Sequence, residues 1–296
     1  MAAGSTWVER LGFAPQARVA VIHVDDIGLC SAANAGALDA LAGAATCGSI
    51  MVPAPGFAEI SRIARARPDL DLGVHLTLNA EWEALRWAPL SAGTAGLRDP
   101  DGLLWRAPEQ TVAHASEDEV RSELRAQLEC ALAAGIDVTH LDAHMGTALD
   151  PRFVRAYFQL AFEFRLPAFI PELECLELSP RQARSAALYR ELIEAARGRG
   201  FPVFDHFEGA SLRFAPGQGL EHNRARLERL GPGLSYLITH CARGDDELRA
   251  LASDWRLREE ERRIYSDGSM QRALDEAGVR TLGMRALREL MRASEG

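Results

Sequence analysis

Short runs of β-branched and apolar residues recur along this 296-residue chain, and most are followed by a stretch with helical spacing. The first run, Arg18–Val24, is nearly continuous, which is typical of a strand buried on both faces. Seven further candidate strands are 48–53, 71–78, a short one from Val138, 167–171, 202–206, 234–240 and 280–283. Strands that alternate with helices in this way predict an α/β fold with a parallel sheet closed as a (β/α) barrel.

The length of the chain suits either two ordinary domains or one barrel-sized domain. Because neither an internal repeat nor a low-complexity linker divides it, we expect residues 1–296 to form a single domain. Residues 79–110 lack periodicity and contain Trp82, Trp87 and Trp105. A long stretch of this kind is uncommon unless it is functional, so we expect an insertion loop at about 79–115.

Composition excludes several classes of partner. The net charge of −9 and the pI near 5.5 argue against a nucleic-acid groove or an anionic membrane surface. The five cysteines form no C-x-x-C pair, so neither a zinc knuckle nor a disulfide framework is indicated. The N-terminus does not resemble a signal peptide, and no run approaches the ~20 apolar residues of a membrane span. We therefore expect a cytoplasmic protein.

Polar residues gather where the predicted strands end. Asp25 and Asp26 follow the first strand, His75 lies in the third, and His140, Asp142 and His144 occupy alternate positions after Val138. Asp205 and His240 end two later strands. The carboxyl ends of parallel strands share one face, which is where such folds keep their active sites. We therefore predict that these residues form one site.

Less specific explanations exist for single members of this set. One aspartate could cap the helix predicted from Ser31, although Ser31 itself stands where a cap is expected. A lone histidine such as His75 in an apolar strand is more often a hydrogen-bonded core residue than a ligand. Asp26 and His144, at the ends of other predicted strands, offer His75 partners.

One carboxylate and two imidazoles make a three-ligand site that suits Zn, Mn, Co, Ni or Fe better than an all-oxygen Mg or Ca site. We expect one divalent ion, its identity open among Zn, Mg, Mn, Co and Ni. The doubled aspartate would supply one ligand and one general base, and His240 is a candidate acid. His140 and Asp142 would orient the ligands.

Three motifs carry a family resemblance: V-D-D-I-G-L from Val24, G-V-H-L-T-L from Gly73 and T-H-L-D-A-H from Thr139. In order and spacing they resemble the motifs of the YdjC-like (ChbG/HpnK) carbohydrate deacetylases, a family related to polysaccharide deacetylases. The resemblance covers roughly the first 150 residues, and the remainder only loosely, through the strand that ends in His240. Together the three motifs are highly specific.

The resemblance implies a distorted (β/α) barrel, a divalent metal and a homodimer. It also implies hydrolysis of an N-acetyl group on a small amino sugar, oligosaccharide or glycoconjugate by metal-activated water. Carried over motif by motif, Asp26, His75 and His144 would bind the metal and Asp25 would be the base. Many members have further histidines after the third motif, where this chain has Met145 and Gly146.

Two other functions fit the same residues. A metal-independent glycoside hydrolase would use two carboxylates, Asp25 with Asp142 or Asp205. A non-catalytic sugar-binding protein could retain a deacetylase scaffold, although the whole proposed metal triad and its base are present. The tryptophans of the insertion loop could hold a sugar ring or anchor the loop. Candidate substrate contacts are Glu81, Trp82, Arg86, Trp87, Trp255 and Arg258.

Overall fold

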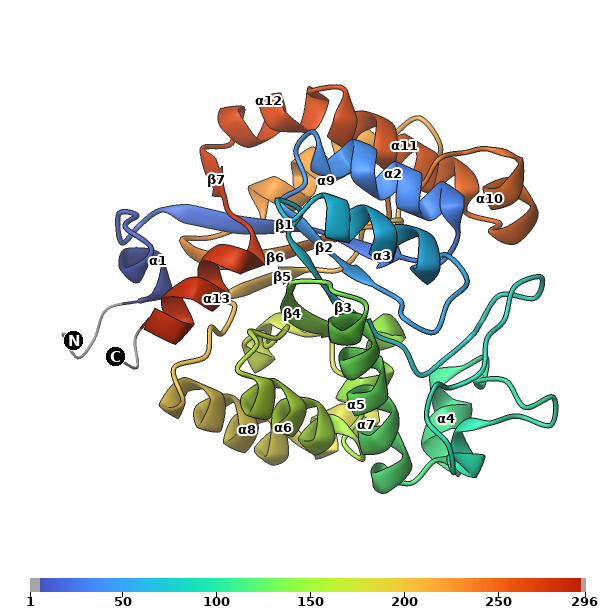
Figure 1. Cartoon of the computed structure of the whole chain (residues 1–296). Coiled ribbons are helices and arrows are strands. Elements are labelled where there is room, and N and C mark those ends of the chain that lie inside the picture. The colour runs from blue at the N-terminus through green and yellow to red at the C-terminus, as the bar shows by residue number, and fades with distance from the viewer. Residues whose placement is uncertain (1–5, 294–296) are drawn as a thin grey trace.

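The longest strand, β1 (Arg18–Ile27), pairs in parallel with three others. In this computed structural model, which describes residues 6–293, β6 (Gly233–Thr239) lies along one edge of β1. The other edge is shared by β7 (Val279–Thr281) near its start and β2 (Cys47–Ile50) near its end. Figure 1 shows these strands at the centre of the molecule, with helices on both sides.

The sheet continues from β2 through β3 (Leu72–Leu76) to β4 (Val138–Ala143). Two isolated parallel bridges, Leu141 to Ala168 and Pro171 to Phe204, then lead to the chain just before β5 (His206–Glu208), and β5 pairs with β6. The ring is thus joined by single bridges at this point, and the predicted distorted (β/α) barrel is confirmed.

Two predicted strands differ from the observed ones. Residues 167–171 form only bridges, and the strand expected at 202–206 is found as β5 at His206–Glu208. Proline explains the weakness of both, because Pro167, Pro171 and Pro202 have no N–H to donate to a strand ladder. Hydrogen bonding between neighbouring barrel segments is therefore sparsest between β4 and β5.

Helices cover the outside of the ring in two groups (Figure 1). On one side lie α2 (Ser31–Leu41), α3 (Phe57–Ala66), α9 (Gly219–Glu228), α10 (Asp246–Leu251), α11 (Trp255–Ser266) and α12 (Ser269–Glu276). On the other lie α5 (Glu117–Ala133), α6 (Val154–Phe164), α7 (Pro180–Arg184) and α8 (Ala186–Gly198). Ser185 separates α7 from α8.

The remaining elements are short. The insertion between β3 and α5 contains a 3₁₀ turn (Ala95–Leu97) and α4 (Pro108–His114). Two further 3₁₀ segments are η2 (His144–Leu149) and η3 (Leu173–Cys175). Helices α1 (Trp7–Arg10) and α13 (Met284–Ala293) lie near the two ends of the chain. Within residues 6–293, no helix is both long and apolar enough to pass through a membrane.

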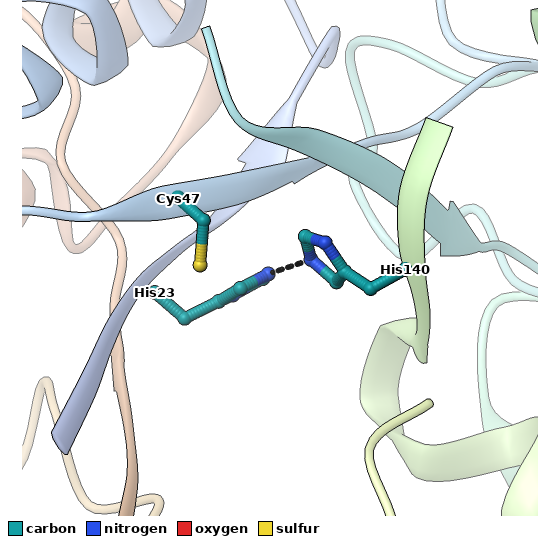
Figure 2. A group of neighbouring side chains, drawn as sticks. All are labelled: His23, Cys47 and His140. Carbon is teal, nitrogen blue, oxygen red and sulfur yellow. Dashed lines mark hydrogen bonds between the residues drawn. The ribbon is translucent and has the colours of Figure 1, made fainter. Parts of the chain in front are cut away.

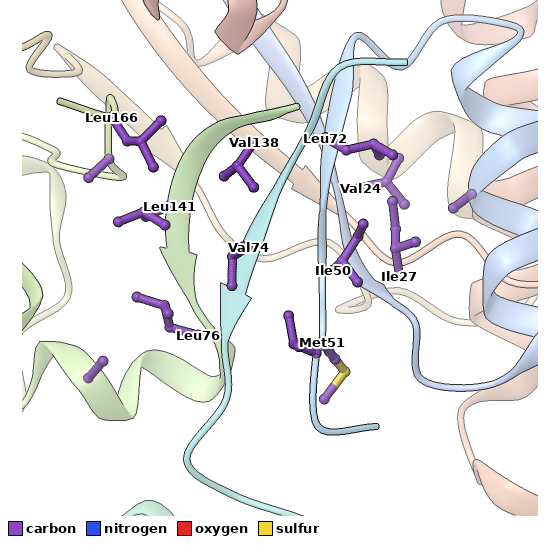
Figure 3. Packing of buried hydrophobic residues seen from close by; sticks show 14 of the residues in the cluster. Val24, Ile27, Ile50, Met51, Leu72, Val74, Leu76, Val138, Leu141 and Leu166 are labelled. Carbon is purple, nitrogen blue, oxygen red and sulfur yellow. The ribbon is translucent and has the colours of Figure 1, made fainter. Parts of the chain in front are cut away.

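Side chains along each strand point alternately to the outside and to the inside of the barrel. The outward side chains are apolar, and the inward ones are partly apolar and partly polar. Val24, Ile50, Leu72, Val74 and Val138 belong to the core between the sheet and the helices (Figure 3). Val19 and Val21 of β1 point to the other face of the sheet, into the barrel. They belong to a second apolar cluster, whose other members include Phe204, Tyr236, Val8 and Met284. This cluster fills the amino-terminal part of the barrel, so polar side chains collect at the carboxyl ends of the strands.

Two irregularities in strand pairing lie next to polar residues. The β1–β2 register shifts between Val24 and Ile27, and the β3–β4 register shifts where 72–74 pairs with 138–141. An extra residue in one strand re-aims its side chains. Asp25 and Asp26 consequently both face the same cleft although they are adjacent in a strand. Asp26 has φ +62°, a left-handed conformation that is costly for residues with a Cβ.

The predicted cap of α2 is wrong. Cys30 is the N-cap residue and makes no side-chain capping bond, while the Ser31 hydroxyl donates to Glu59 at 2.8 Å. The Ala32 N–H at this helix end instead donates to Glu247, also at 2.8 Å. A carboxylate from α10 thus takes the place of a local cap, and neither Asp25 nor Asp26 has that role.

We predict that Gly36→Ala destabilises the fold. A Cβ on Gly36 in α2 would lie 2.3 Å from the Ala242 Cα, in the loop that follows His240. Overpacking of this kind costs about 1–3 kcal/mol in the free energy of unfolding, measurable by urea denaturation. The control is Gly198→Ala in α8, where a Cβ meets no atom of the described chain within 4 Å. Equal stabilities of the two variants would contradict the prediction.

Candidate metal centre and active site

Three buried side chains converge at the carboxyl ends of the strands: Asp26 from β1, His75 from β3 and His144 from the start of η2. His144 Nδ1 lies 3.2 Å from Asp26 Oδ1 and 3.2 Å from His75 Nε2, and His75 Nε2 lies 3.5 Å from Asp26 Oδ1. Asp26 Oδ1 is buried and has no hydrogen-bond partner among the described residues. A buried carboxylate oxygen left in this state fits a cation held by the three atoms.

Arg258 holds the other oxygen of this carboxylate. Its guanidinium donates to Asp26 Oδ2 at 2.8 Å and to Asp254 at 3.1 Å. Burial alone would raise the pKa of Asp26, but the imidazoles of His144 and His75 and the charge of Arg258 hold it well below its usual range. Asp26 is therefore ionised at neutral pH.

Each imidazole is fixed by a carboxylate on the ring nitrogen that faces away from the cluster. His75 Nδ1 lies 2.9 Å from Asp142 Oδ2, and His144 Nε2 lies 3.0 Å from both oxygens of Glu81. Because an ionised carboxylate only accepts, these nitrogens carry the proton. His75 Nε2 and His144 Nδ1 are then directed at Asp26 Oδ1. This carboxylate–histidine arrangement is typical of metal sites.

The same contacts shift the pKa of both imidazoles. Burial lowers the pKa of His75, but the charge of Asp142 raises it well above the usual value. Burial likewise lowers the pKa of His144, and Glu81 and Asp26 raise it to about 9. Burial raises the pKa of Asp142, but the charges of His75 and His23 bring it below its ordinary value.

Asp25 and His240 face each other beside this cluster. His240 Nε2 lies 3.8 Å from Asp25 Oδ2, and His240 Nδ1 lies 2.9 Å from the Ser211 hydroxyl. The buried Glu261 carboxylate accepts from the His240 backbone N–H at 2.7 Å and from Ser211 at 3.0 Å. His240 is thus held through both its backbone and its ring.

Sequence reasoning missed His23, which contacts the other oxygen of Asp25. His23 Nδ1 lies 2.7 Å from Asp25 Oδ1, and its Nε2 lies 2.8 Å from His140 Nε2. Figure 2 shows the two rings meeting, with the Cys47 sulfur beside His23. Burial and the charge of His23 lower the pKa of His140 well below its usual value. Because His23 lies inside a run of β-branched residues, the sequence alone suggests a core residue. Its position two residues before Asp25, on the same face of the strand, is the feature that could have identified it.

Of the predicted substrate contacts, Arg258, Trp82 and Glu81 lie at the cleft or against a candidate metal ligand. Arg258 lines the cleft of about 640 Å³ that contains Asp25, Asp26 and His240. Trp82 stacks on His144, with ring centroids 5.8 Å apart. Glu81, expected only as a possible cleft residue, contacts His144 directly.

Two predicted substrate contacts are not brought to the cleft. Arg86 lies inside the insertion loop, where it pairs with Asp99 at 2.6 Å and donates to the Leu104 carbonyl. Trp255 packs against Arg249 and Arg256 beyond the cleft lining. Both side chains stabilise their own segments, which their residue types alone did not reveal.

The other tryptophans and Asp205 also have structural contacts. Trp87 is buried against Trp82, and Trp105 stacks on His114, so these two anchor the insertion loop. Asp205 Oδ2 accepts from the Leu234 N–H at 2.7 Å, near the amino end of β6. It lies at the opposite end of the barrel strands from Asp25.

Fold and site together define a (β/α)-barrel protein with a buried carboxylate–imidazole cluster at its carboxyl-terminal face. The chain belongs to the family of YdjC-like proteins, which it matches over residues 19–276. The carbohydrate deacetylase of Thermus thermophilus is 37% identical over 290 residues, 96% of this chain and 98% of that protein. That of Thermoanaerobacter pseudethanolicus is 28% identical over 250 residues, 83% of this chain and 90% of that protein.

A solved structure supports the fold assignment. A protein of Enterococcus faecalis V583, described as a cellobiose-phosphate cleavage protein, superimposes with a TM-score of 0.75 at 20% identity. The match covers 92% of this chain and 99% of that one. The family predicted from the three sequence motifs is confirmed, and the predicted enzyme class agrees with the names of the curated relatives.

We predict that Arg258→Met strongly destabilises the protein when it is freed of metal by a chelator. The change removes the guanidinium that pairs with the buried Asp26 carboxylate at 2.8 Å, and loss of one partner of a buried ion pair costs about 3–5 kcal/mol in the free energy of unfolding. Arg262→Met, one turn later on α11, removes more exposed pairs with Glu259 and Asp39 and should cost about 1 kcal/mol or less for each pair. Urea denaturation measures both, and equal losses would contradict the pairing.

Proposed function

We propose that this protein is a metal-dependent hydrolase that removes the N-acetyl group from an amino sugar, free, in an oligosaccharide or in a glycoconjugate. The observation that carries the proposal is the convergence of two oriented imidazoles on Asp26 Oδ1, directly beside Asp25. Asp26 Oδ1 is a buried oxygen that accepts no hydrogen bond from residues 6–293. Family membership and the names of the curated relatives support the same activity.

Asp26, His75 and His144 would hold the metal. Their donor set of one carboxylate and two imidazoles suits Zn, Co, Ni or Mn better than Mg. A divalent ion bound there supplies Lewis-acid polarisation of the acetamide carbonyl and lowers the pKa of water. Asp142 and Glu81 orient the two imidazoles, so His75 Nε2 and His144 Nδ1 would be available to the ion.

Asp25 would act as the general base. Its Oδ1 is occupied by His23, which leaves Oδ2 facing the cleft on the side of His240. Removal of a proton from the attacking water needs an oriented carboxylate oxygen within hydrogen-bond reach. His140 in turn contacts the far nitrogen of His23, so the two buried histidines orient the base.

His240 would protonate the leaving amine. Its Nε2 faces Asp25 Oδ2 across 3.8 Å, and Ser211 and Glu261 fix the ring from behind. An acid and a base on the two sides of the scissile bond are what amide hydrolysis requires, because the amine leaves only when protonated.

The homodimer implied by the family resemblance stays a prediction.

The alternative of a two-carboxylate glycoside hydrolase has less support. Asp142 contacts His75, which leaves it poorly placed for proton transfer to a glycosidic oxygen. Asp205 lies at the amino end of β6. Asp205 therefore does not face Asp25, and Asp142, although it lies near Asp25, is engaged with the candidate metal ligand His75.

We expect Asp25→Asn to lower kcat for acetate release from N-acetylated sugars by about 10²–10⁴-fold, because an amide cannot take the proton from water. Metal content should stay unchanged. Asp205→Asn is the matched control and should retain full activity. An Asp25→Asn protein with the activity of the unaltered chain would refute the assignment of the base.

We also expect metal affinity to rise with pH. A ligating imidazole must be neutral, and the pKa of His144 is raised to about 9, so below that pH the metal has to displace its proton. Apparent Zn affinity should therefore increase as the pH rises through about 9, as measured by competition with a chromogenic chelator. Asp26→Ala and His144→Ala should abolish binding, whereas the exposed His114→Ala should not. Affinity independent of pH would contradict these ligands.

A further inference from the structure

A series of buried polar side chains leads from Asp25 away from the cleft, towards the amino-terminal ends of the strands. His23 Nδ1 lies 2.7 Å from Asp25 Oδ1. On the other side of this ring, His23 Nε2 lies 2.8 Å from His140 Nε2 (Figure 2). His140 Nδ1 lies 2.8 Å from the hydroxyl of Thr139, which donates to Asp71 Oδ1 at 2.5 Å. We call these five side chains the Asp71 network.

The middle of the Asp71 network is closed to water. His23, Thr139 and His140 are fully buried, and only 9% of Asp71 is exposed. The ring of His140 lies against Gly73 in β3, where a Cβ would come within 2.6 Å of His140 Nε2. A glycine at this position therefore leaves room for the ring to reach His23. Because buried polar atoms are hydrogen-bonded, each contact of the network has to contain one proton.

The position of each proton follows from Asp71. Its Oδ2 accepts from the Arg285 backbone N–H at 2.7 Å, so both of its oxygens are acceptors. The single hydroxyl proton of Thr139 is given to Asp71, and the Thr139 oxygen therefore accepts from His140 Nδ1–H. Burial and the charge of His23 lower the pKa of His140 well below its usual value, so His140 is neutral. Its Nε2 then has no proton and accepts from His23 Nε2–H.

His23 is left with protons on both ring nitrogens. One proton is directed at His140, so the 2.7 Å contact with Asp25 Oδ1 needs a second one, which a neutral imidazole does not have. Two carboxylates face this ring, Asp25 and Asp142, whose Oδ2 lies 3.9 Å from His23 Nε2. They favour the cation. A charge-assisted hydrogen bond is about twice as strong as a neutral one, so His23 holds Asp25 Oδ1 firmly.

We infer that Asp71 and Thr139 are positioning residues for the proposed base. Among residues 6–293 neither is part of the cleft lining. They act through His140 and His23, which hold Asp25 Oδ1 and thereby keep Oδ2 facing the cleft. The inference rests on the proposed function, because it assigns a role in catalysis to groups that touch Asp25 only through others.

Asp71→Asn tests the direction of the hydrogen bonds. The Arg285 N–H still needs an acceptor, so the new amide oxygen would face it and the amide nitrogen would donate to Thr139. Thr139 would then donate to His140 Nδ1, and the His140 proton would move to Nε2. Histidine ¹⁵N NMR of the full-length, zinc-loaded protein measures this, with signals assigned from His140→Gln. We expect the proton on Nδ1 in the unaltered protein and on Nε2 in Asp71→Asn. A proton on Nε2 in the unaltered protein, or no change in the variant, would overturn the inference.

Thr139→Val tests the effect on catalysis. Valine keeps the shape of threonine but breaks the Asp71 network. We expect kcat for acetate release from N-acetylated sugars to fall about 10–100-fold, because a small displacement of a catalytic group is costly. KM and zinc content should stay unchanged, and Thr139→Ser, which keeps the hydroxyl, should restore most of the rate. Full kcat in Thr139→Val would contradict the positioning role, as would an equal loss in Thr139→Ser.

A control variant lies at the same end of β4. Asp137 pairs with Arg285 and Arg288 and is not part of the Asp71 network. Asp137→Asn makes the same carboxylate-to-amide change as Asp71→Asn. It should leave both kcat and the position of the His140 proton unchanged. A loss of kcat in Asp137→Asn as large as that in Asp71→Asn would show a general effect on packing and overturn the inference.

NMR and activity together separate the two proposals. If Asp71→Asn moves the His140 proton but the unaltered protein releases no acetate, the direction of the network stands and the proposed function fails. If the unaltered protein is active and Thr139→Val keeps its kcat, the proposed function stands and the positioning role of Asp71 and Thr139 fails.

Discussion

The buried carboxylate of Asp26 is the charge on which the rest of the site depends. Only 3% of the residue is exposed, and it has a left-handed backbone. Such a group is tolerated only where positive partners surround it. Arg258, 232 residues further along the chain, supplies one of them at 2.8 Å. Helix α11, which carries Arg258, therefore ties the C-terminal part of the chain to the strand where the site begins.

The barrel interior is divided between packing and chemistry. Its amino-terminal part is filled by side chains such as Val21, Phe204 and Tyr236, while the carboxyl ends of the strands bear the titratable groups. Tyr236 stacks on His23 where the two parts meet, with centroids 5.0 Å apart. Burial strengthens the hydrogen bonds around Asp25 and His75, because the effective dielectric constant inside the protein is low.

Much of this arrangement could be predicted from the sequence, because residues that follow parallel strands all lie on one face of the barrel. Asp26, His75 and His144 follow or end parallel strands, so their proximity followed from the fold class. The sequence placed Asp25 and Asp26 in the same site but could not say how both reach it, since strict alternation would separate them. The irregularity in β1 between Val24 and Ile27 brings both to the cleft. The side chains of Arg86 and Trp255 could not be placed either, because loop packing and local cation–π contacts, rather than residue type, determine their positions.

The central claim is that a metal ion is held by Asp26, His75 and His144. Two other buried groups, His23 with Cys47 and His140 and His23 with Asp25 and Asp142, also have donor atoms close enough to bind a metal, so the three positions have to be distinguished. Diffraction from a crystal of the zinc-loaded protein, with anomalous data at the zinc edge, locates the ion directly. We expect one peak about 2.0–2.2 Å from Asp26 Oδ1, His75 Nε2 and His144 Nδ1. A peak at either of the two groups that contain His23 instead, or a peak at none of the three groups, would contradict the account.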